Sequence, residues 1–116
     1  MITIYHNSRC RKSREAHQVL EESGKAFKVH FYLDNPLDKA KIKDLLSKIG
    51  IEPMALVRTT EAIWKEHFKG KDLSDQAIIE AMVQYPKLIE RPILESDKTA
   101  CVGRPIDNVH TFLREL

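Results

Sequence analysis

The spacing of hydrophobic positions changes several times along the chain, and each change predicts a new element. A β-branched and aromatic run at 2–5 predicts a buried strand. Ala16, Val19 and Leu20, with charged residues between them, predict an amphipathic helix over 13–22. Further strands are expected at 27–33, 92–94 and 99–102, and further helices at 38–49, 53–68, 74–83 and 105–116.

The order of these elements predicts the fold class. A strand, a helix and a second strand open the chain, which predicts a right-handed parallel crossover. The turn-like segment 95–98 separates two short strands, which predicts an antiparallel hairpin. We therefore expect an α/β fold with a mixed four-stranded sheet flanked by helices. The 116 residues fit a single domain, 1–116, with an all-helical insertion at approximately 38–84.

Composition narrows the class of protein. The chain is 42% hydrophobic and 31% charged, as in ordinary globular proteins. Its net charge of +2 is too small to argue for nucleic acid, and no apolar run approaches the ~20 residues that span a bilayer. The N-terminus does not resemble a secretory signal, and two cysteines are too few for a disulfide-stapled domain. We expect a cytoplasmic protein with reduced thiols and no membrane or nucleic-acid partner.

Cys10 is the strongest candidate for chemistry, because it falls between a strand and a helix. Unpaired amides and the dipole at a helix N-terminus favour an anion, and the same field favours a thiolate over a thiol. His6, four residues upstream, can exchange a proton with the sulfur if it turns toward it. A buried cysteine acting as a small hydrophobe is the alternative, but its neighbours are polar. The nearby cations are Arg9, Arg11, Lys12 and Arg14.

The spacing of the two cysteines limits the mechanism. Ser13 occupies the position at which a dithiol motif has its second cysteine, so a disulfide within the motif is impossible. The hydroxyl of Ser13 can instead donate a hydrogen bond to the thiolate. Cys101 lies in an apolar strand, three residues before Arg104, so the two side chains point to opposite faces. Cys101 is therefore expected in the core, and an external thiol is expected to resolve any adduct on Cys10. The histidines show no ligand spacing with the cysteines, so no metal site is expected.

Three segments resemble one family. TIYHNSRC at 3–10, followed by Ser13-Arg14, resembles the N-terminal motif of the glutaredoxin-linked arsenate reductases, within the arsenate reductase/Spx superfamily. ALVRTTE at 55–61 resembles the middle arginine motif of that family. YPKLIERPI at 85–93, with GRP at 103–105, resembles its C-terminal pair. The resemblance extends over essentially the whole chain, although Ser8 replaces the usual proline.

The resemblance implies a thioredoxin-like fold, a cis-proline and an oxidoreductase activity in arsenic detoxification. In the family a cysteine thiolate attacks arsenate, arginines hold the oxyanion, glutathione adds to the arsenic, and glutaredoxin completes the cycle as arsenite leaves. No cofactor is bound, and glutathione is the reducing co-substrate. The implied site comprises catalytic Cys10 and His6, oxyanion-binding Arg58, Arg91 and Arg104, and supporting Ser13, Arg14 and Pro92.

Other functions and simpler roles stay open at this point. An Spx-like regulator that binds RNA polymerase would share the fold, although its redox switch needs the second cysteine that Ser13 replaces. A glutathione-dependent monothiol oxidoreductase would use the basic loop to hold the carboxylates of glutathione. Each arginine could also be an ion-pair partner, for example Arg91 with Glu90 or Glu95.

Overall fold

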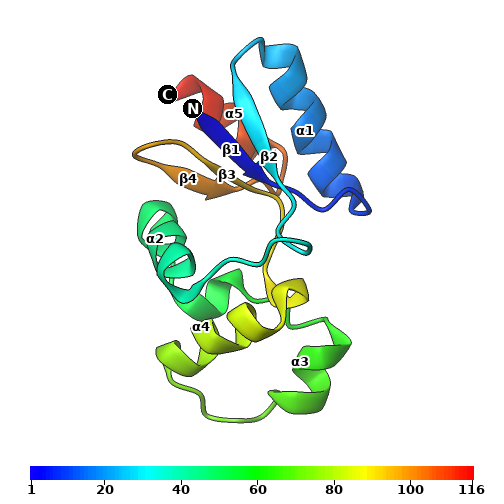
Figure 1. Cartoon of the computed structure of the whole chain (residues 1–116), viewed down its shortest axis with the longest axis vertical. Coiled ribbons are helices and arrows are strands. Elements are labelled where there is room, and N and C mark those ends of the chain that lie inside the picture. Colours follow the sequence, from blue (N-terminus) through cyan, green and yellow to red (C-terminus); the bar gives the residue numbers. More distant parts are fainter. The chain divides into compact units, whose positions relative to one another are not determined.

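The two ends of the chain share one sheet, and the middle of the chain forms a separate helical unit (Figure 1). In the computed structural model, which describes residues 1–116, the first unit comprises residues 1–35 and 91–116, and the second comprises residues 36–90. The expected helical insertion, 38–84, falls inside the second unit. The assignment of 1–116 to a single domain stays a prediction.

The sheet of the first unit has four strands in the order β2-β1-β3-β4. β1 (Ile2–Tyr5) pairs in parallel with β2 (Phe27–His30) and antiparallel with β3 (Ile93–Glu95), which pairs antiparallel with β4 (Ala100–Val102). This arrangement confirms the mixed sheet, the parallel crossover and the hairpin that the sequence predicts.

One face of this sheet carries the core of the first unit. Side chains alternate between the faces of a strand, so Ile2 and Ile4 point to the same side as Leu94 of β3. Two helices pack there, α1 (Arg11–Ser23) and α5 (Asp107–Arg114). Their inward residues are Ala16, Leu20, Val109 and Phe112, all buried.

The ends of three elements differ from the expectation. α1 begins at Arg11 rather than at residue 13 and ends at Ser23, and Gly24, with a φ of 73°, caps the helix as expected. β2 stops at His30 rather than at residue 33, because the chain turns there and Phe31 accepts hydrogen bonds from the amides of Asp34 and Asn35. α5 begins at Asp107 rather than at residue 105, since Pro105 belongs to the preceding turn.

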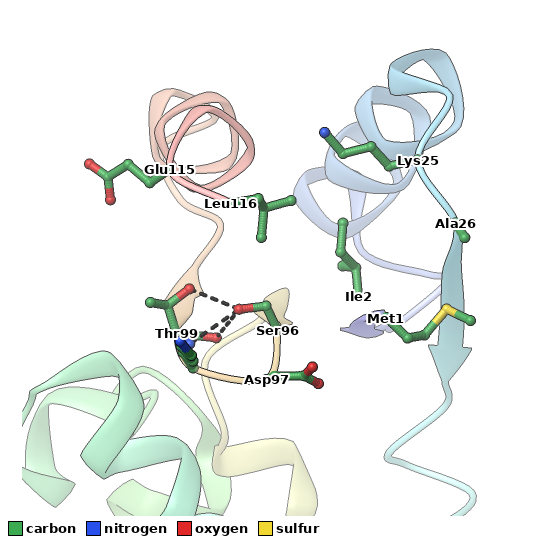
Figure 2. A pocket seen from close by; sticks show the side chains of 10 residues that line it. Met1, Ile2, Lys25, Ala26, Ser96, Asp97, Thr99, Glu115 and Leu116 are labelled. Atoms are coloured by element: carbon green, nitrogen blue, oxygen red, sulfur yellow. Dashed lines mark hydrogen bonds between the residues drawn. The ribbon is translucent and has the colours of Figure 1, made fainter.

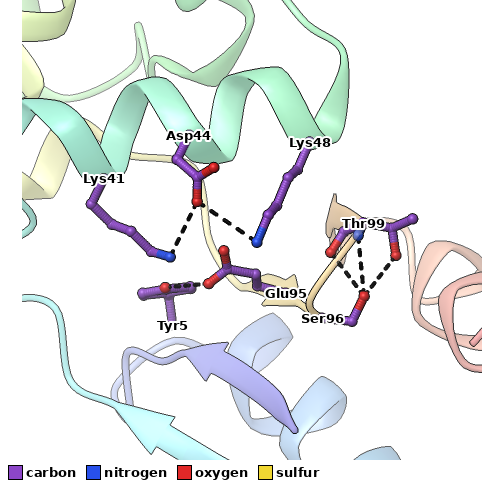
Figure 3. Close-up of polar contacts among 7 residues, drawn as sticks. All are labelled: Tyr5, Lys41, Asp44, Lys48, Glu95, Ser96 and Thr99. Carbon is purple, nitrogen blue, oxygen red and sulfur yellow. Dashed lines mark hydrogen bonds and ion pairs between the residues drawn. The ribbon is translucent and has the colours of Figure 1, made fainter.

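The opposite face of the sheet carries a buried polar pair. Glu95, expected in the turn after the third strand, is the last residue of β3 and only 6% exposed. The hydroxyl of Tyr5 donates to its Oε1 at 2.6 Å (Figure 3). Burying a carboxylate is costly unless it accepts hydrogen bonds. The hydroxyl of Tyr5 supplies such a bond from the neighbouring strand.

The second unit contains α2 (Lys39–Ile49), α3 (Ala62–His67) and α4 (Asp75–Gln84). Ser74 caps α4 as expected, by accepting from the amide of Ala77. Asp38 caps α2 in the same way, and Asp44 on that helix lies between Lys41 at 3.4 Å and Lys48 at 3.7 Å (Figure 3). No helix of the chain combines the length and the apolar character that crossing a membrane requires.

The single helix expected at 53–68 is wrong, because the chain is extended in the middle of it. The 3₁₀ helix η1 (Pro53–Leu56) precedes Val57, whose backbone is extended, and α3 starts only at Ala62. Val57 forms a bridge to Ile89, which follows a second 3₁₀ helix, η2 (Pro86–Leu88). The Arg58 amide donates to Leu88 O at 2.7 Å, and the Glu90 amide donates to Leu56 O at 2.8 Å. This pairing replaces the helical hydrogen bonds.

Candidate active site

Most residues of the expected site belong to the first unit and lie at one end of its sheet. β1 ends there, immediately before His6, and α1 begins after a short loop that contains Cys10. β3 runs in the opposite direction and begins there, immediately after Arg91 and Pro92. β4 ends there, two residues before Arg104. The topology thus brings together residues that are almost a hundred positions apart in the sequence.

Cys10 is the N-cap residue of α1, as the sequence predicts, and its side chain makes no capping hydrogen bond. Its amide donates to Asn7 O at 3.0 Å, which closes the preceding loop into a turn, and its carbonyl accepts from the amide of Arg14 at 3.0 Å. The sulfur-bearing residue is half-buried. Because the amides of a first helical turn lack partners within the helix, they can donate to an anion that reaches Cys10.

Ser13 holds His6 and the loop rather than the sulfur. Its hydroxyl is completely buried, shares a hydrogen bond of 2.6 Å with His6 Nδ1, and accepts from the amide of Asn7 at 3.0 Å. Ser13 forms no hydrogen bond with the sulfur of Cys10, although its position in the sequence allows one. Arg14 holds the same loop from outside, since its Nη1 donates to Ser8 O at 3.0 Å. Both supporting residues therefore shape the segment that positions Cys10.

His6 is buried, and its surroundings disfavour the charged imidazolium. Burial is the main cause that lowers the pKa of His6 below the usual histidine value, and the nearby charges of His17 and Arg14 lower it further. The His6 ring also lies 5.8 Å from the exposed ring of Phe31. A neutral histidine near pH 7 can accept a proton, which a residue that assists a thiol must do.

Arg91 and Arg104 lie opposite each other, just beyond the open end of the β3–β4 hairpin. The amide of Gly103 donates to Pro92 O at 2.8 Å, one residue beyond the last pair of β3 and β4, so the backbones of the two arginines are adjacent. The Arg91–Pro92 peptide bond is cis, as the resemblance implies. Nε and Nη1 of Arg91 are shielded from solvent. The Arg104 carbonyl accepts from Asn108 Nδ2 at 3.1 Å, which fixes this segment against α5.

We expect Gly103→Ala to destabilise the first unit, because the position has no room for a methyl group. A Cβ at Gly103 would lie 3.0 Å from Pro92 Cγ and 3.0 Å from Val109 Cγ2, both in buried residues. Overpacking of this kind typically costs about 1–3 kcal/mol. Urea unfolding measures the loss, with Asp97→Ala in the exposed hairpin turn as the control. Equal free energies of unfolding for the two variants would contradict the expectation.

Arg58 belongs to the second unit, where two carboxylates hold its guanidinium. Nη1 lies 3.0 Å from Glu61 Oε1, and Nε lies 3.5 Å from Glu90 Oε1. The Arg58 side chain is 21% exposed. These contacts orient the guanidinium. They also show that Arg58 is an ion-pair partner, the simpler role that the sequence left open. Its role in holding an oxyanion stays a prediction.

Cys101 packs against the core of the first unit, as expected. Its sulfur donates to Asn108 O at 3.7 Å. Burial raises the pKa of the Cys101 thiol to about 11, despite a backbone hydrogen bond that acts in the other direction. Little of this thiol is ionised near neutral pH, so Cys101 is poorly suited to attack an adduct.

We expect iodoacetamide to label Cys101 slowly. The thiolate is the reactive form, and a pKa of about 11 instead of 9.0 leaves about 100-fold less thiolate at pH 8 than an unperturbed thiol has. The labelling rate should rise about tenfold per pH unit between pH 8 and 10, since the pKa lies above that range. Mass spectrometry of the peptide that contains Cys101 measures the rate, with free glutathione as the reference. A rate equal to that of glutathione would show that the thiol is not protected.

The cations around Cys10 leave this end of the first unit positively charged. Arg9, Arg11 and Lys12 are exposed, and Glu15 is the only carboxylate that pairs with any of them, at 3.2 Å from Arg11 and 3.9 Å from Lys12. Exposed pairs of this kind are weak. The excess of positive charge favours the approach of an anion.

One residue that is not among those predicted from the sequence also touches the site. The ring of His17 on α1 stacks on the ring of His6, with the ring centroids 5.1 Å apart. The signal was available, because Ser13 and His17 are four residues apart and therefore lie on one face of the helix. Ser13 was assigned to the site from the sequence, but His17 was not.

A cavity of about 540 Å³ lies at the opposite end of the sheet, next to the start of β1 and the hairpin turn. Ile2, Lys25 and Leu116 line it, together with a turn closed by hydrogen bonds between Ser96 and Thr99 (Figure 2). It contains none of the expected site residues. The cavity is therefore separate from the candidate active site.

Comparison with known proteins places these features in a family. The model of the ArsC family matches residues 5–112. An uncharacterized protein of Escherichia coli K12, YfgD, is 43% identical over 110 residues, which cover 93% of this chain and 92% of that protein. An arsenate reductase of Neisseria meningitidis is 39% identical over 114 residues, which cover 97% of each chain. The structure of an arsenate reductase from Vibrio cholerae superposes with a TM-score of 0.90, at 40% identity and 95% coverage of both chains. The chain belongs to the ArsC family and has its thioredoxin-like fold.

Proposed function

We propose that this protein reduces arsenate to arsenite, with Cys10 as the nucleophile and external thiols as the source of electrons. The observation that carries the proposal is the gathering of Cys10, His6, Arg91 and Arg104 at one end of the sheet. The chain belongs to the ArsC family, and several of its relatives are arsenate reductases, which supports arsenate as the substrate.

Arsenate is a dianion near neutral pH, so a thiolate that approaches it meets electrostatic repulsion. The amides of the first turn of α1 and the guanidinium groups of Arg91 and Arg104 offset that repulsion. Guanidinium groups keep their charge and match oxyanions with pairs of donors. We propose the same role for Arg58. Such donors contribute most when charge on the oxygens peaks, in the transition state.

In the first step the sulfur of Cys10 attacks As(V), an S–As bond forms, and one oxygen takes up protons and leaves as water. In the second step the thiol of glutathione supplies the second sulfur of the disulfide. Cys10 and glutathione then form a disulfide, arsenic gains two electrons to become As(III), and arsenite leaves. One arsenate and two thiols thus give one arsenite, one disulfide and one water.

We propose an external thiol because neither of two positions in the chain is suited to resolve an adduct on Cys10. Ser13 stands where a resolving cysteine would be, and its hydroxyl holds His6. The Cys101 thiol has a pKa of about 11 because of burial, and is therefore a poor attacking group. We propose glutathione as the second thiol and glutaredoxin as the reductant of the Cys10–glutathione disulfide. This cycle needs a compartment that maintains reduced glutathione, and we propose the cytoplasm.

A coupled assay tests the proposal. The protein is incubated with arsenate, glutathione and glutaredoxin, glutathione reductase reports disulfide formation through NADPH oxidation, and chromatography with mass detection measures arsenite. We expect arsenite and NADPH oxidation in equal amounts, and a strong loss of rate when glutaredoxin is omitted. Arsenite formation no faster than in the protein-free reaction would overturn the proposal.

Two outcomes of the assay would support other functions. Turnover of a small glutathione mixed disulfide without any arsenite would indicate a monothiol oxidoreductase. Absence of both activities, with recovery of RNA polymerase in a pull-down, would indicate an Spx-like regulator. The same protein preparation serves all three measurements, so the results are directly comparable.

A further inference from the structure

One face of α1 carries three polar side chains that lead from the candidate site toward solvent. Ser13, His17 and Glu21 are spaced by four residues, so they lie in a row along the helix. Ser13 contacts His6 and is fully buried, whereas the His17 side chain is 30% exposed and that of Glu21 is 59% exposed. The buried end of this row, Ser13, contacts the imidazole of His6.

We propose that His17, oriented by Glu21, is a positioning residue that holds the His6 ring and sets its protonation state. The proposal rests on the proposed function only in assuming that His6 assists Cys10. It concerns a residue outside the motif segments that carry the resemblance to arsenate reductases.

The geometry fixes the His17 ring from three sides. It stacks on His6 with an interplanar angle of 22°, and it meets the edge of Phe27 at 5.5 Å and 85°. His17 Nδ1 lies 3.0 Å from Glu21 Oε1. At this distance the Glu21 carboxylate forms an ion pair with a protonated His17. The ring is therefore oriented and is not merely an exposed helix side chain.

His6 is in turn held at its face by His17 and at its edge by Ser13, which bonds Nδ1 at 2.6 Å. These two contacts leave Nε2 as the ring nitrogen that remains for exchange of a proton. A ring with both its face and its edge fixed needs no reorientation before it acts, which is the benefit of preorganised groups in catalysis.

The nearby positive charges both disfavour the protonated form of His6. α1 contributes His17 and Arg14, and both oppose a second proton on His6. The end of β2 contributes the carbonyl of His30, which accepts from the His6 amide at 2.9 Å, and the uncharged ring of Phe31. Burial has the larger effect on the pKa of His6, and His17 adds to it. His6 therefore stays neutral at a pH at which an exposed histidine is already charged.

Proton NMR of the His6 Cε1–H during a pH titration tests this role without substrate. We expect His17→Phe to retain the stacked ring but to remove its charge. The titration midpoint of His6 should rise by about half a pH unit, the effect of one charge at ~5 Å in a medium close to water. It should stay below the ordinary value of about 6.5, because the ring remains buried. Glu21→Gln, which removes the orienting carboxylate, should shift the midpoint in the same direction by less.

Glu22→Gln is the matched control, because Glu22 is an exposed neighbour on the same helix and forms no ion pair with a histidine. It should leave the midpoint of His6 unchanged. An unchanged midpoint in folded His17→Phe would overturn the proposal, and a Glu21→Gln response equal to that of Glu22→Gln would overturn the role of Glu21. If His17→Phe fails to fold, His17→Gln provides the same comparison without an aromatic ring.

The pH profile of arsenate reduction supplies the functional readout. The neutral form of His6, which accepts a proton, is lost as the pH falls. We therefore expect the acid limb of kcat/KM to move up by the same half unit in His17→Phe. A purely structural role would lower the rate at every pH and leave the limb in place. A shifted NMR midpoint without any arsenite formation would refute the proposed function alone, and arsenite formation with an unshifted midpoint would refute this inference alone.

Discussion

Replacing Cys10 with serine is expected to reduce thiol-dependent arsenite formation by about 10⁴-fold or more, the size of loss seen when a nucleophile is removed. A serine hydroxyl at this position is far less ionised than a thiol and cannot form the S–As bond or the disulfide that carries the two electrons. The fold should be retained, since Cys10 makes no capping hydrogen bond and serine is a preferred N-cap residue. Arsenite formed in the coupled assay, together with the thermal midpoint of unfolding, measures both effects.

Cys101→Ser is the matched control for this substitution. Cys101 packs against the core of the first unit, so its replacement should lower the free energy of unfolding. Its turnover should remain within about twofold of the natural protein, since its protonated thiol takes no part in the proposed cycle. If Cys101→Ser abolished turnover as well, Cys101 rather than glutathione would be the resolving thiol. Turnover that survived in Cys10→Ser would refute the assignment of the nucleophile.

Local patterns predicted most of the fold. The first strand and α1 were found because Ile2 and Ile4 are β-branched and Ala16 and Leu20 have helical spacing. The errors arise where tertiary contacts override the local pattern. The segment 53–68 has apolar residues at helical spacing, yet Val57 pairs with Ile89, which is distant in sequence, and extends the chain between two short helices.

The site was predictable to a more limited degree. Cys10 was found from local physics, because the dipole of α1 and the neighbouring cations act within a few residues of the sulfur. Arg91 and Arg104 were identified only by resemblance, since no short-range rule indicates that the Pro92–Gly103 hydrogen bond makes them adjacent. The His17 contact was missed because polar pairs with a spacing of four are common on exposed helix faces. Its significance depends on the end of β1, where His6 lies.

Replacing Arg104 with glutamine is expected to reduce kcat/KM for arsenate by about 10²–10³-fold, the usual effect of removing one donor that stabilises a developing oxyanion. Arg104 follows β4 at the same end of the sheet as Cys10, and its segment is held by Asn108. Unlike Arg58, it takes part in no ion pair, so its charge is not neutralised by a carboxylate. Arg104→Lys keeps the charge but loses the two parallel donors of the guanidinium. It should therefore show an intermediate rate.

The reduction of a small glutathione mixed disulfide separates oxyanion binding from thiol reactivity. That reaction uses Cys10 but presents no arsenate oxygens, so Arg104→Gln should retain most of it while Cys10→Ser loses it. Arg114→Gln, an exposed arginine in the last turn of α5, controls for loss of a positive charge and should leave both reactions unchanged. Equal losses of both reactions in Arg104→Gln would mean that the arginine supports the thiol and not the oxyanion. The arsenate specificity proposed for this end of the sheet would then lose its main support.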